Sequence, residues 1–313
     1  MRAFRNVSRT TPFDDKHEFP NISRRYVVDE FMTEGGKNVQ FHVPQDGSRV
    51  AIVVECVQGE GGYVPAPREF LLGLRRICDR HGILLIVDEV QSGMGRTGKM
   101  FACDHYSLEP DILCLAKGIA SGLPLGVCIA RADVMNWPPG AHASTFGGNP
   151  VAIAAALKTI ELLERELIAN CKEVGKYLEN GLRQLMSKHR LIRDIRGLGM
   201  MLGVEFGADS NSHMSSGQLA ERVASEAFRR GLILLTAGKS TIRWSPPLIL
   251  TREQAAVALE IFDEAIAAAA VDSESVANHG ALEPCASPGA GSNAYFSQHR
   301  HCIVPMAEEW VNG

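Results

Sequence analysis

Long apolar runs are missing from this chain of 313 residues. None approaches the ~20 consecutive apolar residues that span a bilayer, and no signal-peptide core follows Met1. The sequence therefore argues against a membrane protein and against a secreted protein. Basic residues are scattered, and the formal net charge of −4 argues against a nucleic-acid backbone as the partner.

Paired cysteine motifs are also missing, although the chain contains 8 cysteines. None stands in a C-x-x-C pair, and most lie inside or beside apolar runs. This pattern predicts small buried hydrophobic side chains in a reducing compartment, and neither disulfides nor a zinc site. His299, His301 and Cys302 have no further spaced ligands, so we expect no metal.

Acidic residues are missing from the first thirteen positions, which contain Arg2, Arg5 and Arg9. This composition is similar to that of a mitochondrial presequence. The alternative is an irregular N-terminal segment without a targeting role. We expect a cytoplasmic protein, with a mitochondrial location as the second choice.

Regular hydrophobic patterning begins at residue 50 and predicts a large α/β domain over residues 50–170. Continuous apolar runs indicate strands that are buried on both faces, and a stripe with helical spacing lies between the first two runs. Strand, helix and strand with short links predict a largely parallel sheet. The expected elements are strands at 50–55, 83–87, 111–115 and 125–130 and a helix at 67–82.

The remaining segments differ in pattern from this domain. Residues 1–49 are polar and irregular, with one short helix expected near 24–32, and residues 149–189 are expected to be helical with a break near Asn170. Residues 271–313 are rich in Ser, Ala, Gly, Asn and Pro and are expected to be disordered. A smaller α+β domain is expected over 171–270, with strand character at 192–206, 232–235 and 241–244 and helices at 216–231 and 251–269.

Five short motifs stand out, and four of them follow predicted strands, where open α/β sheets build their sites. The four are E-C-V-Q-G-E-G-G at 55–62, V-D-E-V-Q-S-G at 87–93, L-A-K-G at 115–118 and H-A-S-T-F-G-G-N-P at 142–150. The fifth, I-R-W-S-P-P-L at 242–248, lies in the smaller domain.

Lys117 and Asp88 are the residues of these motifs with the clearest chemistry. A desolvated lysine loses proton affinity and becomes a nucleophile toward aldehydes. A lone lysine after a strand is more often a solvated strand end. Asp88 ends an apolar strand, and a carboxylate there needs a cationic partner, which a protonated pyridine nitrogen provides. Taken alone, Asp88 is equally compatible with a helix cap or a buried salt bridge.

The order and spacing of the five motifs resemble the class III, or ω-type, aminotransferases of pyridoxal fold type I. Members include 4-aminobutyrate, ornithine and acetylornithine aminotransferases, and the resemblance covers residues 50–269. It implies an α/β fold whose large domain has a mostly parallel, incomplete sheet, together with a smaller C-terminal α+β domain. It also implies pyridoxal 5'-phosphate as the cofactor, transamination between an ω-amino acid or amine and an α-keto acid, and a homodimer with shared active sites.

The resemblance implies a cofactor role for five residues. Lys117 forms the Schiff base with the cofactor and then moves the proton between substrate and cofactor carbons. Asp88 pairs with the pyridinium nitrogen, Val90 lies against one ring face, and Gln91 hydrogen-bonds the ring hydroxyl. Thr145 reaches across the dimer interface to the phosphate of the partner's cofactor.

Three further residues are expected to serve the substrate. Arg243 binds the carboxylate of an α-amino acid or α-keto acid, and Glu60 pairs with Arg243 when the substrate is an ω-amine. The alternative for Glu60 and Arg243 is a permanent salt bridge. Glu55 is expected nearby, in a less defined role. Cys56 departs from the family pattern, which usually has proline there to stiffen the bend.

Upstream of the first motif, family members have a Ser/Gly-Thr-rich loop that holds the cofactor phosphate at a helix N-terminus, an aromatic residue that stacks on the ring, and an N-terminal arm that shapes the substrate pocket. Residues 1–49 contain no such loop, and no motif around Phe31 or Phe41 identifies a stacking role. No helix that could hold an anion follows Gly35 and Gly36. We therefore expect an N-terminally truncated member with weak or absent activity, unless a separate chain supplies the missing part.

Three competing interpretations remain. Residues 93–98 match the G-x-G-x-x-G dinucleotide fingerprint, but no convincing helix follows them and residues 88–92 separate them from the strand. Within the cofactor class, a racemase would use the same lysine and aspartate. From a different class, an inactive chain could serve as a dimerising module.

Overall fold

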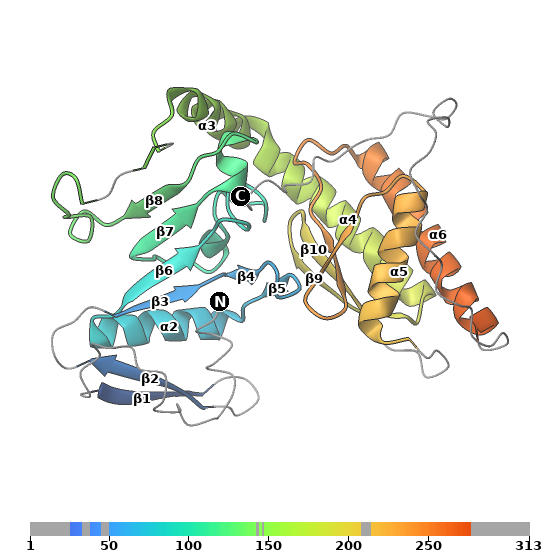
Figure 1. The fold of residues 1–313 in the computed structure, drawn as a ribbon, viewed down its shortest axis with the longest axis horizontal. Coiled ribbons are helices and arrows are strands. Elements are labelled where there is room, and N and C mark those ends of the chain that lie inside the picture. Colours follow the sequence, from blue (N-terminus) through green and yellow to red (C-terminus); the bar gives the residue numbers. More distant parts are fainter. Residues whose placement is uncertain are drawn as a thin grey trace, which may run out of the picture. The chain divides into compact units, whose positions relative to one another are not determined.

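The computed structural model describes residues 26–32, 38–44, 50–141, 144–145, 147–207 and 214–276. The chain divides into two compact units (Figure 1): the first contains Met1–Gly59 and Val64–Lys172, and the second contains Glu60–Tyr63 and Glu173–Gly313. Three predictions concern residues outside the described ones: the Arg-rich first thirteen positions, the Gly35 and Gly36 pair, and the disordered tail beyond Val276.

A four-stranded sheet forms the centre of the first unit, in the order β3-β6-β7-β8. The strands are β3 (Ala51–Val54), β6 (Leu84–Asp88), β7 (Ile112–Leu115) and β8 (Val127–Ala130). β3 pairs with β6 and β6 with β7 in parallel, whereas β8 runs antiparallel to β7. The largely parallel sheet expected from the sequence is therefore confirmed, with its antiparallel strand at one edge.

Helix α2 (Arg68–His81) connects β3 and β6, as the hydrophobic stripe predicts. Its buried face includes Leu71, Leu74 and Ile77, and it ends at Gly82, whose φ of 64° places it in the left-handed region. Glycine adopts this conformation without the steric cost that a side chain would add. The Gly82 N–H donates to the Cys78 carbonyl and closes the last turn.

The prediction of a short helix near residues 24–32 is wrong. The structure has a two-stranded antiparallel sheet there, formed by β1 (Tyr26–Met32) and β2 (Asn38–Pro44). Valine and aromatic residues in Y-V-V-D-E-F-M favour strands, and N-V-Q-F-H-V alternates apolar and polar residues. The periodicity of two was the stronger signal, so residues 1–49 are not wholly irregular.

The long helical segment continues where a break was expected. Helix α3 (Pro150–Leu162) passes through one π-helical stretch, η3 (Leu163–Leu167), into helix α4 (Ile168–Lys188). The interruption therefore lies at 163–167 instead of near Asn170. L-E-R-E-L contains only good helix formers, so the chain stays helical and absorbs one extra residue as a π turn.

The second unit has an antiparallel four-stranded sheet in the order β11-β12-β10-β9. These strands are β9 (Ile192–Leu198), β10 (Met201–Phe206), β11 (Leu235–Ala237) and β12 (Thr241–Trp244). Helices α5 (Ser216–Arg229) and α6 (Arg252–Val276) complete the unit. The strand expected at 232–235 begins only at Leu235, and α6 extends to Val276, so the disorder expected from residue 271 is wrong for 271–276.

One face of this second sheet is apolar and forms the core of the unit. Leu202, Val204 and Ile242 are buried on it. The rings of Trp244 and Phe262 meet edge to face, with centroids 5.1 Å apart and an interplanar angle of 83°. Because side chains alternate along a strand, the opposite face carries the polar residues, among them Arg243.

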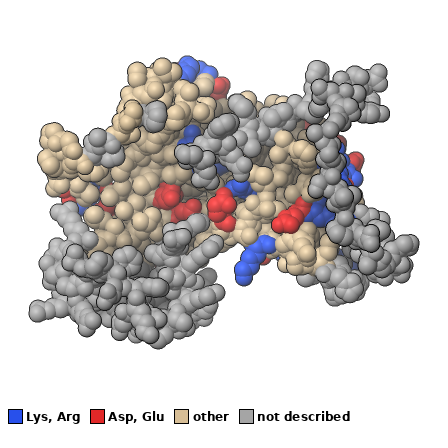
Figure 2. Space-filling model, in the orientation of Figure 1, with Lys and Arg blue, Asp and Glu red and all other residues tan. Residues whose placement is uncertain are grey.

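Short elements complete the description. Two-residue strands β4 (Val57–Gln58) and β5 (Val64–Pro65) pair antiparallel on either side of Gly59–Tyr63. Two 3-10 turns, η1 (Ala102–His105) and η2 (Lys117–Ala120), follow β6 and β7. No helix among the described residues is long and apolar enough to cross a membrane. Acidic and basic side chains are interspersed on the face in Figure 2, where the described residues show no continuous basic patch.

Candidate functional site

The ends of three parallel strands bring charged residues to one edge of the first sheet. Asp88 is the last residue of β6 and lies level with Cys114 of β7. Lys117 opens η2 directly after β7, and Glu55 directly follows β3. Because parallel strands share their carboxyl edge, Asp88, Lys117 and Glu55 lie on the same side of the sheet.

Lys117 has an unusual backbone conformation for a residue with a side chain. Its φ of 46° lies in the left-handed region, which costs energy for any residue but glycine. Such outliers persist where the surrounding structure imposes them, and they cluster at functional sites. The desolvation expected for Lys117 is not found, however, because its side chain is exposed.

Asp88 accepts a hydrogen bond from the Val90 backbone N–H at 2.9 Å. Its side chain is half-buried, and no salt bridge within the described part of the chain neutralises it. The salt-bridge alternative therefore gains no support from the described residues. A half-buried carboxylate with a single backbone donor can still accept a bond from a cationic ligand group.

Gln91 has an acceptor that no group among the described residues uses. Its Oε1 atom is buried and lacks a hydrogen-bond partner in the described structure. The side chain lies close to Gly59, where an added Cβ would come within 2.4 Å of that oxygen. A buried acceptor without a donor is destabilising by about 1–3 kcal/mol, so Gln91 fits a ligand that supplies a hydroxyl.

The pKa of Glu55 depends on the charges of Asp88 and Lys117. Burial raises the pKa of its carboxyl, the Gly59 N–H opposes that rise, Asp88 adds to it and Lys117 opposes it. The Gly59 N–H lies 3.5 Å from the Glu55 carboxylate. Glu55, Asp88 and Lys117 therefore form one electrostatic cluster, although the sequence indicated no defined role for Glu55.

Glu89 is a buried carboxylate that the sequence analysis missed. It accepts from the Ser92 hydroxyl at 2.6 Å and from the Cys103 backbone N–H at 2.7 Å. Burial raises the pKa of Glu89, and these hydrogen bonds oppose the rise. Glu89 thereby fixes the turns that follow Asp88. The only signal was a second acid directly after Asp88 in V-D-E-V-Q-S-G.

Cys56, the departure from the family pattern, is completely buried. Burial first, and then the Glu89 carboxylate, raise the pKa of its thiol, so it remains a neutral, small apolar side chain. Five of the six described cysteines are buried or half-buried, as expected, but Cys128 is exposed.

Thr145 lies in an exposed turn before α3. The Gly147 N–H donates to the Ser144 hydroxyl at 3.1 Å, and the Asn149 side chain caps α3. His142, Ala143 and Phe146 of the same motif lie outside the described residues. The structure thus locates Thr145 at the surface and leaves its expected role as a prediction.

The two remaining residues form a pair in the second unit. Arg243 of β12 donates from Nη1 to Oε1 of Glu60 at 2.6 Å. The Arg243 side chain is 20% exposed and that of Glu60 is 64% exposed. The salt bridge is therefore accessible to water, which weakens it and lets the carboxylate leave easily.

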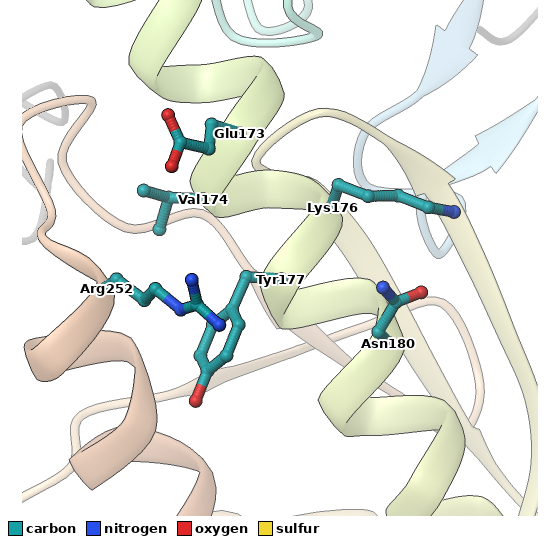
Figure 3. A pocket seen from close by; sticks show the side chains of 6 residues that line it. All are labelled: Glu173, Val174, Lys176, Tyr177, Asn180 and Arg252. Atoms are coloured by element: carbon teal, nitrogen blue, oxygen red, sulfur yellow. The ribbon is translucent and has the colours of Figure 1, made fainter.

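A separate surface depression of about 220 Å³ lies beside α4 and the start of α6 (Figure 3). The Arg252 guanidinium stacks 4.8 Å from the centroid of the Tyr177 ring. Lys176 points away from this stack in Figure 3. The depression contains none of the residues singled out from the sequence and offers no convergent set of polar groups. Its lining is Glu173, Val174, Lys176, Tyr177, Asn180 and Arg252.

Residues 32–266 match the family model described as aminotransferase class-III. The chain is 39% identical over 222 residues to an acetylornithine aminotransferase of Caldanaerobacter subterraneus subsp. tengcongensis, covering 71% of this chain and 54% of the relative. It is 41% identical over 219 residues to that of Clostridium acetobutylicum, covering 69% of this chain and 54% of the relative. The chain thus spans about half the length of these curated relatives.

Solved structures with the same fold include an N-acetylornithine aminotransferase from Stenotrophomonas maltophilia K279a. Its TM-score is 0.64 at 35% identity, over 71% of this chain and 57% of that one. An amine transaminase from an uncultivated Pseudomonas species, solved in its PLP-bound internal aldimine form, has a TM-score of 0.64 at 36% identity, over 70% and 52%.

Proposed function

Because this chain belongs to the class-III aminotransferase family, we propose that it transfers an amino group from an ω-amino acid or amine to an α-keto acid. The observation that carries the proposal is the carboxyl edge of the first sheet. There Asp88 ends β6, Lys117 follows the neighbouring β7, and Gln91, close to Asp88 in sequence, has a buried acceptor without a partner among the described residues. Lysine, aspartate and an orphaned amide oxygen match the aldehyde, ring nitrogen and ring hydroxyl of pyridoxal 5'-phosphate.

The residues divide the work as follows. When bound, pyridoxal 5'-phosphate supplies an electron sink that stabilises the negative charge left when the substrate loses its α-proton. Lys117 would be the covalent attachment point and would then act as the base that holds and returns that proton. Asp88 would keep the ring nitrogen protonated, Val90 would lie against one ring face, and Gln91 would hydrogen-bond the ring hydroxyl. Glu55 would adjust the local charge, since Asp88 and Lys117 both act electrostatically on the pKa of its carboxyl.

We further propose that the Glu60–Arg243 pair switches between substrates. Arg243 binds the carboxylate of an α-keto acid, and Glu60 replaces that carboxylate when the substrate has none beside its amine. An unpaired Arg243 in a closed site would cost several kcal/mol by rough estimate. The short contact and the high exposure of Glu60 support a pair that forms and separates readily.

A homodimer is the proposed assembly. Val151 and Leu157 on α3 are both 65% exposed, and a second copy of the chain would cover such apolar side chains. Thr145 lies in the turn before this helix, which supports its proposed contact with the phosphate of the partner's cofactor. The names of the matched relatives favour transamination over racemisation and over an inactive module.

Reduction with borohydride tests the proposal directly. The full chain, incubated with excess pyridoxal 5'-phosphate and reduced, should retain the cofactor covalently on a peptide containing Lys117. Lys117→Ala should lose this label. Lys158→Ala removes an exposed lysine of α3 that pairs with Glu161 and should keep it. A label on Lys117→Ala equal to that of the unaltered chain would refute the assignment.

Addition of an amine donor separates the two reactions. Transamination leaves the cofactor in its amine form and converts the donor into the corresponding aldehyde or ketone, whereas racemisation returns the cofactor unchanged. A visible spectrum that recovers fully after donor addition, together with inversion of an amino acid, would favour the racemase instead.

A further inference from the structure

The polar face of the second sheet places two arginines on either side of a glycine. Gly203 of β10 lies opposite Arg196 of β9 and also opposite Arg243 of β12. Residues that face each other on neighbouring antiparallel strands point to the same side of the sheet. The two arginines therefore flank a gap above Gly203, which Gly203 itself, having no side chain, leaves open to a neighbouring segment.

The segment Glu60–Tyr63 occupies this gap, which explains why it clusters with the second unit. A Cβ added at Gly203 would lie 3.1 Å from both the Gly62 carbonyl oxygen and the Tyr63 Cβ. The Gly238 N–H donates to the Glu60 carbonyl at 2.8 Å. The segment is thus held by its backbone, and it presents the Glu60 carboxylate to Arg243.

Arg196 binds both the segment Glu60–Tyr63 and the strands beside it. Its Nε and Nη2 atoms both donate to the Gly62 carbonyl, at 3.0 and 2.8 Å. Nη2 also donates to the Thr241 hydroxyl at 2.9 Å, while Nη1 contacts the carboxylates of Asp194 and Glu205. The planar guanidinium reaches one carbonyl with two donors, which the single ammonium of a lysine cannot reproduce.

From this geometry we infer that Arg196 is a positioning residue, which clamps the Gly62 carbonyl and thereby sets the strength of the Glu60–Arg243 pair. The inference rests on the proposed roles of Glu60 and Arg243. With the backbone of the segment fixed, Glu60 needs to order only its side chain to reach Arg243, so pairing loses less entropy. A stronger pair competes more effectively with an incoming substrate carboxylate. Arg196 therefore tunes the preference between substrates with and without a carboxylate beside the amine.

Amide hydrogen exchange at Gly238 reports on the clamp without requiring activity. The Gly238 N–H is protected by the Glu60 carbonyl, so it exchanges when the segment leaves the sheet. Arg196→Lys in the full chain should raise its exchange rate at least tenfold. Asp194→Asn is the matched control, because it removes a partner of Nη1 that is 52% exposed and spares both bonds to Gly62. Its rate should stay within twofold of the unaltered chain.

Binding of pyruvate, a simple α-keto acid, reports on the pair. Glu60→Gln removes the competing charge, so the Kd for pyruvate should fall severalfold. Arg196→Lys should lower the Kd in the same direction, and the double variant should bind little better than either single variant. Asp194→Asn should bind as the unaltered chain does.

The exchange and binding experiments together can overturn or support the role of Arg196. Unchanged exchange at Gly238 in Arg196→Lys, or equal acceleration in Asp194→Asn, overturns the clamp. Faster exchange with tighter pyruvate binding supports it. If Glu60→Gln does not alter pyruvate binding, the proposed role of Glu60 fails, while the exchange rate still decides whether Arg196 holds the segment. If Arg196→Lys does not fold, Gly203→Ala displaces the Gly62 carbonyl sterically and should accelerate exchange in the same way.

Discussion

Lys117 has a backbone conformation that suits glycine. A left-handed φ costs a residue with a Cβ roughly 1–2 kcal/mol. We therefore predict that Lys117→Gly is more stable than Lys117→Ala by ~1 kcal/mol, although both remove the amine. The denaturant midpoint of each variant measures the difference.

Lys158 in the middle of α3 supplies a control of opposite sign. In a regular helix, glycine is less favourable than alanine by ~1 kcal/mol, so Lys158→Gly should be the less stable member of its pair. The same order at both positions would mean that the conformation of Lys117 is not imposed by the fold.

The Glu60–Arg243 pair predicts a difference between the two half-reactions. Glu60→Gln should slow the half-reaction with an amine that has no neighbouring carboxylate, because Arg243 then faces the substrate without a counter-charge. The half-reaction with an α-keto acid should be less affected. Single-turnover rates in both directions measure the ratio, and equal losses would indicate a permanent salt bridge.

At the scale of elements, the turns after β6 depend on the buried carboxyl group of Glu89. Burial raises the pKa of Glu89 above its ordinary value of 4.5. The folded state therefore binds its proton more tightly than the unfolded state does. It follows that the Glu89 contribution to the free energy of unfolding is most favourable below pH 4.5 and falls as pH rises through the raised pKa.

Urea unfolding at a series of pH values checks this sign. The stability difference between the unaltered chain and Glu89→Gln should shift in favour of Glu89→Gln as the pH rises above 4.5, and then become constant. Glu161→Gln on the surface of α3 serves as the control, since the pKa of Glu161 is lowered by its hydrogen bond to Lys158. A parallel response of the two variants would contradict the prediction.

The elements that could be predicted are those whose pattern repeats. Apolar runs identified β6 and β7, and a helical stripe with a closing glycine identified α2. The failures have local causes. The residues of β1 were assigned to a helix and those of β2 to an irregular segment, although their valine and aromatic residues favour strands. No helix-breaking residue marks the π-helical stretch at 163–167. The sequence pattern also gave no sign that Glu89 would be buried. Its hydrogen-bond donor, the Cys103 backbone N–H, lies 14 residues further along the chain and reaches Glu89 only in the folded structure.

At the scale of the whole molecule, the exposed apolar residues of α3 predict association. Leu157→Glu should shift the chain from dimer to monomer without changing its helical content, because a buried charge at an interface costs several kcal/mol by rough estimate. Lys158→Glu changes charge at the neighbouring position and should shift the equilibrium less. Sedimentation velocity at several concentrations measures both, and a dimer that survives Leu157→Glu would place the interface elsewhere.

The sequence divided the chain at residue 170, close to the division at Lys172, but it did not show that Glu60–Tyr63 belongs to the second unit. Lys117, Asp88, Gln91 and Glu55 could be singled out because they lie at or just after the ends of recognisable strands. Glu60 was expected to meet Arg243 only through the family resemblance. The contact depends on Gly203 and Arg196, and neither residue attracted attention in a pattern of strands.

The segment Glu60–Tyr63 also limits how this chain could be recombined with its relatives. A crossover at Lys172 would divide the sequence where the two units change. It would take Glu60–Tyr63 from one parent and the second sheet, which this segment contacts, from the other. In such a chimera the segment and the sheet would come from different proteins and would not be matched to each other. Recombinants should therefore tolerate this junction only when both parents have compatible residues at positions 62, 196 and 203, even though the segment contains just four residues.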